Sequence, residues 1–170
     1  MALLTTEQLR NQVSTGLTDP ALQAILDREE AELVRRIGAH PDGVTAVVEM
    51  RQPEALHVYL CYPVVSVSSV EERALGSTTW ATVTTNAYEV DPGSAYLELV
   101  SGTWGARVRV TYIPTDQRPR RAAALIEIIR LALERTAMKS ENIAGEYSYT
   151  APEWDIVRAD IYRTLGFMEV

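Results

Sequence analysis

Cysteine and long apolar stretches are nearly missing from this sequence of 170 residues. Because Cys61 is the only cysteine, a disulfide within the chain is excluded. No apolar run approaches the ~20 residues that a membrane span needs, and residues 1–10 lack the basic and then apolar segments of a secretion signal. We therefore expect no membrane contact and a protein that stays in the cytoplasm where it is made.

Basic charge is also scarce. Sixteen Lys and Arg stand against 23 Asp and Glu, and residues 1–43, 44–118 and 119–170 are each net negative. Because tight DNA binding depends on neutralising phosphates, a chain with a net charge of −7 is a poor candidate for a DNA-binding protein. The 46% of hydrophobic residues is typical of a soluble globular protein that buries a core without a structural metal.

Groups with catalytic chemistry are few. His40, His57 and Cys61 match no HExxH or CxxC spacing, so a metal site is not expected. His57 and Cys61 would share one face of a strand, but four residues along a strand span roughly 13 Å, which is beyond hydrogen-bond reach. The G-x-S-x-G, P-loop and G-x-G-x-x-G motifs are absent. We predict no catalytic residue, metal or cofactor, with an enzyme of unfamiliar type as a remaining alternative.

Two helices are predicted at the N-terminus. Thr5 and Gln8 have the spacing of a capping box at the start of the first. The dipeptide Asp19-Pro20 predicts the start of the second, with the Asp19 side chain accepting hydrogen bonds from first-turn amides. Apolar residues recur every three or four positions up to Ile37, and Gly38 should end this helix.

Residues 44–113 change to a period of two, as expected for strands with one solvent-exposed face. Turn-forming residues divide this stretch into five to six strands, which favours a small, mostly antiparallel sheet or barrel. Residues 102–105 (GTWG) precede the last strand and predict a tight hairpin with a bulge.

Two more helices are predicted near the C-terminus, after Pro119 and after Pro152. Residues 122–133 are apolar on most sides, which indicates burial on more than one side and suggests contact with another subunit. The candidates for this subunit packing are Leu125, Ile128, Ile129 and Leu133. The predicted fold class is α+β: helical parts 1–43 and 119–170 pack as one domain, and the β block 44–118 is inserted between them.

The order of these elements carries a resemblance. Five segments occur in sequence: residues 4–10 (LTTEQLR), 17–22 (LTDPAL), 62–70 (YPVVSVSSV), 104–112 (WGARVRVTY) and 140–149 (SENIAGEYSY). As an ordered set, together with a helix rich in Ala and Leu that begins at a proline, they resemble the head-to-tail connector (adaptor) proteins of tailed bacteriophages.

The resemblance implies a structural virion protein made in the host cytoplasm. In this family about a dozen copies form a neck ring between the portal protein and the stopper or tail terminator protein, and viral DNA passes through the channel without specific binding during genome ejection. Head completion and tail closure are the alternative structural roles.

The resemblance also implies two contact regions. Portal docking is assigned to the C-terminal residues Leu165, Gly166, Phe167, Met168, Glu169 and Val170. A partner or subunit contact is assigned to the loop formed by Glu141, Asn142, Ile143, Ala144, Gly145, Glu146, Tyr147, Ser148 and Tyr149. The apolar character of Leu165, Phe167, Met168 and Val170 is unusual for a disordered tail and favours docking.

Overall fold

The computed structural model describes residues 2–91, 93–140 and 154–165, and it confirms the α+β class. Backbone contacts divide the chain into two compact units. We call residues 1–40 together with 118–170 the helical unit, and residues 41–117 the β unit.

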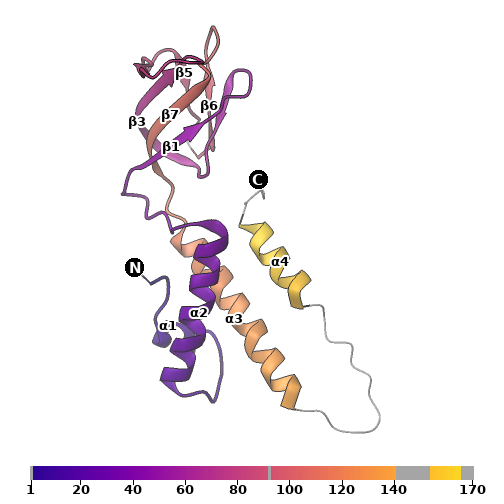
Figure 1. The fold of residues 1–170 in the computed structure, drawn as a ribbon. Helices are drawn as coiled ribbons and strands as arrows, with labels where there is room; N and C mark the ends of the chain where they lie inside the picture. The colour runs from indigo at the N-terminus through magenta and orange to yellow at the C-terminus, as the bar shows by residue number, and fades with distance from the viewer. Residues whose placement is uncertain (1, 92, 141–153, 166–170) are drawn as a thin grey trace. The chain divides into compact units, whose positions relative to one another are not determined.

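The helical unit contains α1 (Thr6–Arg10), α2 (Asp19–Ile37), α3 (Arg118–Ser140) and α4 (Trp154–Thr164) (Figure 1). The predicted capping box is confirmed, because the Gln8 amide donates to Thr5 Oγ1 and the Thr5 amide donates to Gln8 Oε1. The predicted end of α2 is also confirmed: Gly38 follows Ile37 with a φ of 75°, which glycine adopts without steric cost.

The predicted cap at the start of α2 is wrong. Thr18 occupies the N-cap position, and no side chain accepts a hydrogen bond there. Asp19 instead pairs with Arg10 of α1 at 2.6 Å. The ion pair between the two helices therefore replaces the local cap that the Asp-Pro sequence favours.

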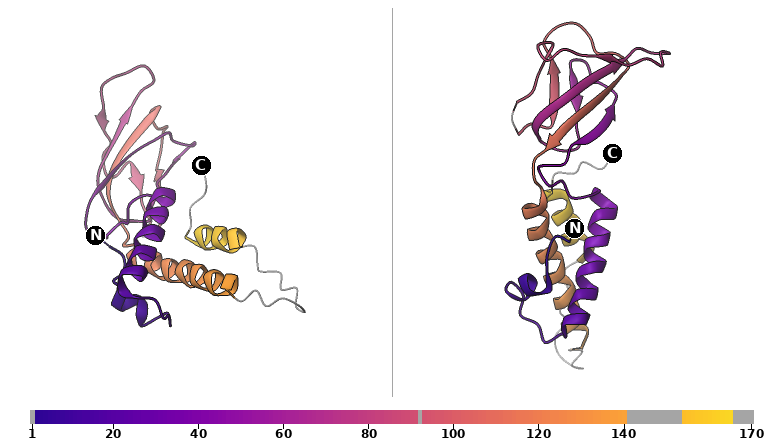
Figure 2. Two further views of the ribbon diagram at one scale, coloured as in Figure 1. Left: turned by 60° about the horizontal axis from the view of Figure 1, so that its bottom comes forward. Right: turned by 90° about the vertical axis from the view of Figure 1, so that its left-hand side faces the viewer.

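Two apolar cores hold the helices together. The first joins α1 and its flanking residues to α2 and α3, and its buried members are Leu4, Leu9, Val13, Leu22, Leu26, Leu125 and Ile129. The second joins α2, α3 and α4, and its buried members are Leu33, Ile37, Ala124, Ile128, Ile161, Tyr162 and Leu165. Helix α3 contributes to both cores and contacts α2, and the right-hand view of Figure 2 shows the two helices side by side.

The β unit contains two antiparallel sheets. Sheet A has the order β1 (Val47–Arg51), β7 (Arg107–Pro114), β3 (Val64–Arg73) and β4 (Ala81–Thr82). Sheet B has the order β2 (His57–Tyr59), β6 (Tyr96–Leu99) and β5 (Tyr88–Glu89). The described residues thus form seven strands, more than the five to six predicted, because β4 and β5 are only two residues long.

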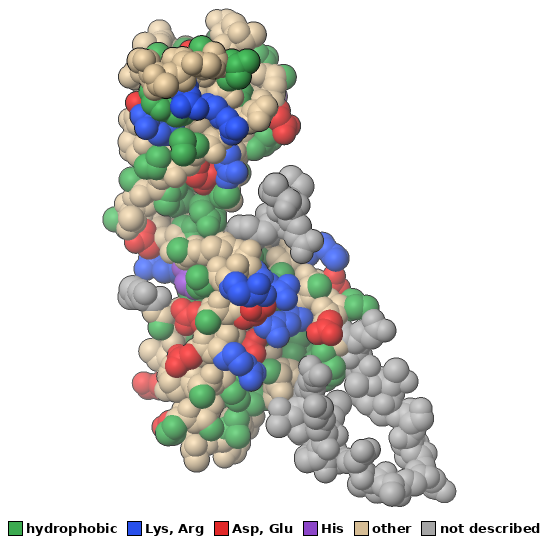
Figure 3. All heavy atoms as spheres, in the orientation of Figure 1, with side chains coloured by type: hydrophobic (Ala, Val, Ile, Leu, Met, Phe, Trp, Pro, Cys, Tyr) green, Lys and Arg blue, Asp and Glu red, His purple; other side chains and the backbone are tan. Residues whose placement is uncertain are grey.

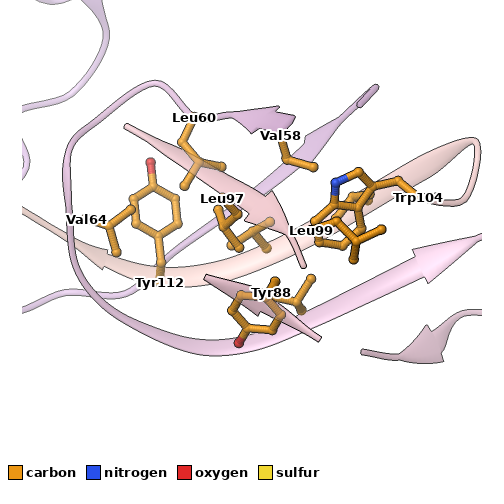
Figure 4. Close-up of a cluster of buried hydrophobic side chains, with 11 residues drawn as sticks. Val58, Leu60, Val64, Tyr88, Leu97, Leu99, Trp104 and Tyr112 are labelled. Atoms are coloured by element: carbon orange, nitrogen blue, oxygen red, sulfur yellow. The ribbon is translucent and has the colours of Figure 1, made fainter. Parts of the chain in front are cut away.

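The two sheets share one core, which Figure 4 shows in close-up. Alternate residues of β7 (Val108, Val110 and Tyr112) are fully buried, as are Val58 of β2 and Leu97 of β6. Since neighbouring residues of a strand point to opposite faces, the intervening residues of each sheet form an outer face. These outer faces carry the charged side chains discussed below.

The predicted hairpin at residues 102–105 is wrong. Strand β6 pairs with β2 and β5, whereas β7 pairs with β1 and β3, so this turn connects the two sheets. Trp104 is buried, and its Nε1–H donates to the Leu56 carbonyl at 2.7 Å. A Cβ added to Gly105 would lie 2.9 Å from the Arg73 carbonyl oxygen. This close approach of two backbone segments accounts for the glycine.

Candidate assembly surfaces

Three of the four arginines of the β unit lie on the outer face of sheet A. The Trp80 ring lies against two of them, with its centroid 5.0 Å from Arg73 Cζ and 4.6 Å from Arg109 Cζ. Arg109 also forms a two-pronged ion pair with Glu71, at 2.7 and 2.8 Å, and this lowers the pKa of the Glu71 carboxyl group. We call Glu71, Arg73, Trp80, Arg107 and Arg109 the basic face; its net charge is +2 in a unit whose residues 41–117 sum to −5.

The strand register places two arginines of this face directly opposite each other. Arg73 of β3 and Arg107 of β7 are cross-strand partners, and neither forms an ion pair in the part of the chain that the structure describes. A hollow of about 410 Å³ lies beside them, lined also by Pro53 and Leu75. Figure 3 shows blue basic side chains gathered on this unit beside green apolar ones. Like charges on directly opposite residues of neighbouring strands repel and destabilise a sheet, so the pairing of Arg73 with Arg107 is unfavourable in the isolated chain.

The outer face of sheet B has the opposite charge. Glu89 of β5 and Glu98 of β6 are cross-strand partners, and Asp91 follows β5 closely. The Asp91 carboxylate raises the pKa of Tyr96, whose hydroxyl donates to it at 3.5 Å. Glu98 lies 3.7 Å from Nε2 of His57.

Aromatic rings flank these carboxylates. The ring centroids of His57 and Tyr59 are 5.9 Å apart, and Tyr96 lies 5.5 Å from His57 and 6.2 Å from Tyr59. The side of the unit that bears His57, Tyr59, Glu89, Asp91, Tyr96 and Glu98 is called the acidic face. It combines a negative field with a half-exposed aromatic cluster, which is a composition suited to a protein interface.

Exposed apolar side chains also concentrate on the β unit. Among the described residues, eight of the ten exposed large hydrophobic residues belong to it. Val48 and Met50 of β1 are 62% and 67% exposed, and they lie on the basic side because they pair in register with Thr111 and Arg109. Among these described residues, exposed large hydrophobic side chains are therefore more numerous in the β unit than in the helical unit.

In the helical unit a buried arginine joins α3 to the end of α2. Arg121 is 1% exposed, and it donates hydrogen bonds to the carbonyls of Ile37, Gly38 and Ala39. These carbonyls have no partner within α2, and they form the negative end of its dipole. Arg121 Nη1 also donates to His40 Nδ1 at 2.8 Å, which places the ring proton of His40 on Nε2.

A partly buried ion pair holds α4 against α2. Glu29 is 3% exposed, and its Oε2 lies 2.6 Å from Nη2 of Arg158. Arg158 also donates to the Tyr162 hydroxyl, and the Arg36 guanidinium lies 4.8 Å from the Tyr162 ring centroid. These contacts fix α4 against α2.

The structure changes the interpretation of several residues assigned to contacts with other proteins. Leu125, Ile128 and Ile129, predicted for subunit packing, are at most 2% exposed inside a single chain. The α1 segment and α2 cover Leu125 and Ile129, whereas α2 and α4 cover Ile128. Leu165, predicted for portal docking, is likewise part of the α2–α3–α4 core. All four side chains are buried within the single chain, and their assignment to contacts with other proteins stays a prediction.

Leu133 differs from those residues because it is only partly buried. It lines an open groove of about 820 Å³ together with Val13, Leu17, Ile25 and Arg130. Residues 141–149 and 166–170, which carry the other predicted contacts, lie outside the described residues.

The surroundings of Cys61 and of the candidate metal ligands bear on whether these groups can be reactive. Burial raises the pKa of the Cys61 thiol, and the Glu49 carboxylate beside it acts in the same direction, so a thiolate nucleophile is not favoured there. Within residues 2–91, 93–140 and 154–165, no three His, Cys, Asp or Glu side chains are placed to hold a metal ion. No helix in those ranges is long and apolar enough to span a membrane.

Comparisons with known proteins give matches among solved structures. No protein-family model matches the chain, and a search of curated proteins returns no match. Among solved structures, the chain is similar to one in a structure described as the neck of an empty GTA particle computed with C6 symmetry. The TM-score is 0.51 at 12% sequence identity, and the match covers 99% of this chain and 91% of that chain. This likeness shows a shared fold across both units.

Proposed function

We propose that this protein is a structural component of the neck of a tailed, phage-like particle, where it acts as the head-to-tail adaptor. The observation that carries this function is the match of the whole chain, helical unit and β unit together, to a chain in a particle neck. The ordered segments that resemble phage connectors support the same role independently. The described residues form three apolar cores and two charged faces that can serve as assembly surfaces.

The adaptor is proposed to act as a ring of about twelve copies. A structure with C6 symmetry repeats every chain that lies off the axis six times or a multiple of six, which fits this copy number. The portal protein lies on one side of the ring, and the stopper or tail terminator protein lies on the other. With −7 per copy, the ring presents a net negative field that keeps DNA from adhering while it moves through the channel.

Portal binding is assigned to the C-terminal segment, residues 166–170. The partly buried ion pair of Glu29 with Arg158 and the burial of Leu165 fix the place where this segment begins. A short apolar segment that leaves a fixed point loses less conformational entropy on docking than one attached to a mobile helix. The loop of residues 141–149 is proposed as the second contact with a neighbouring copy or partner.

Fractionation of assembly intermediates tests the adaptor role. Particles blocked before head-to-tail joining are separated into filled heads and free tails, and this protein is quantified in each fraction by mass spectrometry. An adaptor stays with the heads, at about one copy per portal subunit. Recovery with free tails would identify a tail-closure protein, and absence from both fractions would refute a structural role in the neck.

Removal of the C-terminal segment tests portal binding. Deletion of residues 167–170 removes none of the described members of the two helical cores, so the variant should fold while losing capture by immobilised portal. The matched control is Glu169→Gln, which keeps the apolar residues of the segment and should keep capture. Full portal binding by the deletion variant would remove this segment from the interface.

A further inference from the structure

We propose that adjacent copies pack head to tail through their β units, with the basic face of one copy against the acidic face of the next. This inference rests on the ring of the proposed function and identifies the surfaces that build it. It follows from two like-charged cross-strand pairs of opposite sign, Arg73 with Arg107 and Glu89 with Glu98, on the outer faces of the two sheets.

Each pair is unfavourable in the isolated chain. Residues in register on neighbouring strands have their Cβ atoms about 5 Å apart, and like charges at that distance repel. Glu71 neutralises Arg109 but leaves Arg73 and Arg107 without an ion pair among the described residues. A carboxylate brought to this arginine pair removes the repulsion, and the acidic face of a neighbouring copy supplies two in the same cross-strand arrangement.

The two faces lie on opposite sides of one core, and this decides the type of contact. The inner faces of sheets A and B both pack into that core, so the charged outer faces point away from each other. A basic face cannot pack on a second basic face without placing arginine against arginine, which disfavours a two-fold dimer. Pairing opposite faces gives a head-to-tail contact that repeats from copy to copy, and such contacts form a closed ring when the rotation between neighbouring copies closes.

The uncharged side chains of the two faces also match. Val48 and Met50 lie beside the arginines and are largely exposed, and Tyr59 on the acidic face is 51% exposed. Guanidinium groups stack favourably on aromatic rings, and Tyr, Met and Arg are enriched at protein interfaces. The contact therefore buries apolar area as well as pairing charges.

Charge reversal in the full-length chain tests this contact. Arg107→Glu lowers the net charge of the basic face from +2 to 0, and Glu98→Arg changes the net charge of the acidic face from −3 to −1. Self-association is measured by sedimentation velocity at low ionic strength over protein concentrations up to about 1 mM. The wild type should associate and should dissociate as salt is added, whereas each variant alone should associate at least about tenfold more weakly.

A mixture of the two variants tests whether the intact face of each can still pair with the intact face of the other. The Arg107→Glu copy keeps its acidic face and the Glu98→Arg copy keeps its basic face, so an equimolar mixture should recover association that neither variant shows alone. Glu54→Arg, in the exposed turn before β2, changes the net charge as Glu98→Arg does and should associate like the wild type. Circular dichroism confirms that every variant is folded.

Two results would overturn the contact: a wild type that stays monomeric throughout, or association that both reversals leave unchanged. The second result, combined with normal recovery of the protein on heads, would leave the adaptor role intact and place the ring contact elsewhere. Loss of the protein from heads despite charge-dependent association would instead overturn the adaptor role and keep the β-unit contact.

Discussion

Mild acid should destabilise the helical unit through one buried imidazole. The His40 side chain is 8% exposed, and its Nδ1 accepts a hydrogen bond from Arg121. Burial lowers the pKa of His40 to about 4, and the positive charge of Arg121 acts in the same direction. The ring is therefore neutral in the folded protein at pH 7, and a second proton would have to enter at Nδ1, facing the guanidinium.

The sign and size of the effect follow from these values. An unfolded histidine titrates near 6.5, so between about pH 6.5 and pH 4 the unfolded chain binds more protons than the folded chain. Stability contributed by His40 is complete above pH 6.5 and is lost as the pH falls through this window. One pKa unit is worth about 1.4 kcal/mol, so the loss is about 2 kcal/mol at pH 5 and about 3 kcal/mol at pH 4.

Urea unfolding measures this loss. Circular dichroism at 222 nm follows the helical unit at pH 7 and at pH 5 for the wild type and for His40→Gln. The control is His57→Gln, which removes the other histidine of the chain, a side chain 35% exposed in the β unit. Carboxylates contribute equally to all three proteins, so the wild type and the control should lose about 2 kcal/mol more than His40→Gln. Equal losses in all three would refute the assignment.

Two further predictions concern packing. Glu29→Gln keeps the shape of the side chain but leaves Arg158 without its counterion; because Arg158 is one-third exposed, unfolding followed at 222 nm should become easier by about 1–2 kcal/mol. Unchanged stability would show that this ion pair does not hold α4. Gly105→Ala forces a Cβ to within 2.9 Å of a backbone oxygen and should cost about 1–3 kcal/mol in thermal unfolding. Gly16→Ala, with no atom within 4 Å of the added Cβ, is the matched control and should be neutral.

The helix boundaries were predictable from the sequence because short-range contacts determine them. The capping box at Thr5 and the left-handed glycine after Ile37 act within a few residues. The predicted Asp19 cap is wrong because a contact with a more distant residue determines where this side chain lies. Arg10, nine residues earlier in the chain, donates a hydrogen bond to the Asp19 carboxylate. The strands were recognised from their period of two, and the α+β class followed from the same patterns.

Which strands, helices and residues contact one another was not predictable in the same way, because these contacts join residues that are far apart in the sequence. Residues 102–105 have hairpin composition, but Trp104 bonds to a carbonyl 48 residues earlier and directs the chain into the other sheet. Helix α3 is apolar on most sides because two cores of its own chain cover it, and composition alone cannot separate this from coverage by another subunit. The charged faces depend on strand register, which becomes visible only when β3 is aligned with β7 and β5 with β6.

The like-charged pairs link the stability of one copy to the assembly of many. If the repulsion between Arg73 and Arg107 serves assembly with a neighbouring copy, removing it should stabilise the isolated chain. Arg107→Glu places a carboxylate opposite Arg73 and should therefore raise the free energy of unfolding by about 0.2–1 kcal/mol. The same substitution should weaken association. Thermal unfolding followed by tryptophan fluorescence measures the change in stability. The variant is kept dilute, so that self-association does not contribute to the result. A variant that is both less stable and less associated would mean that Arg107 supports the fold, and the repulsion could then not be attributed to assembly.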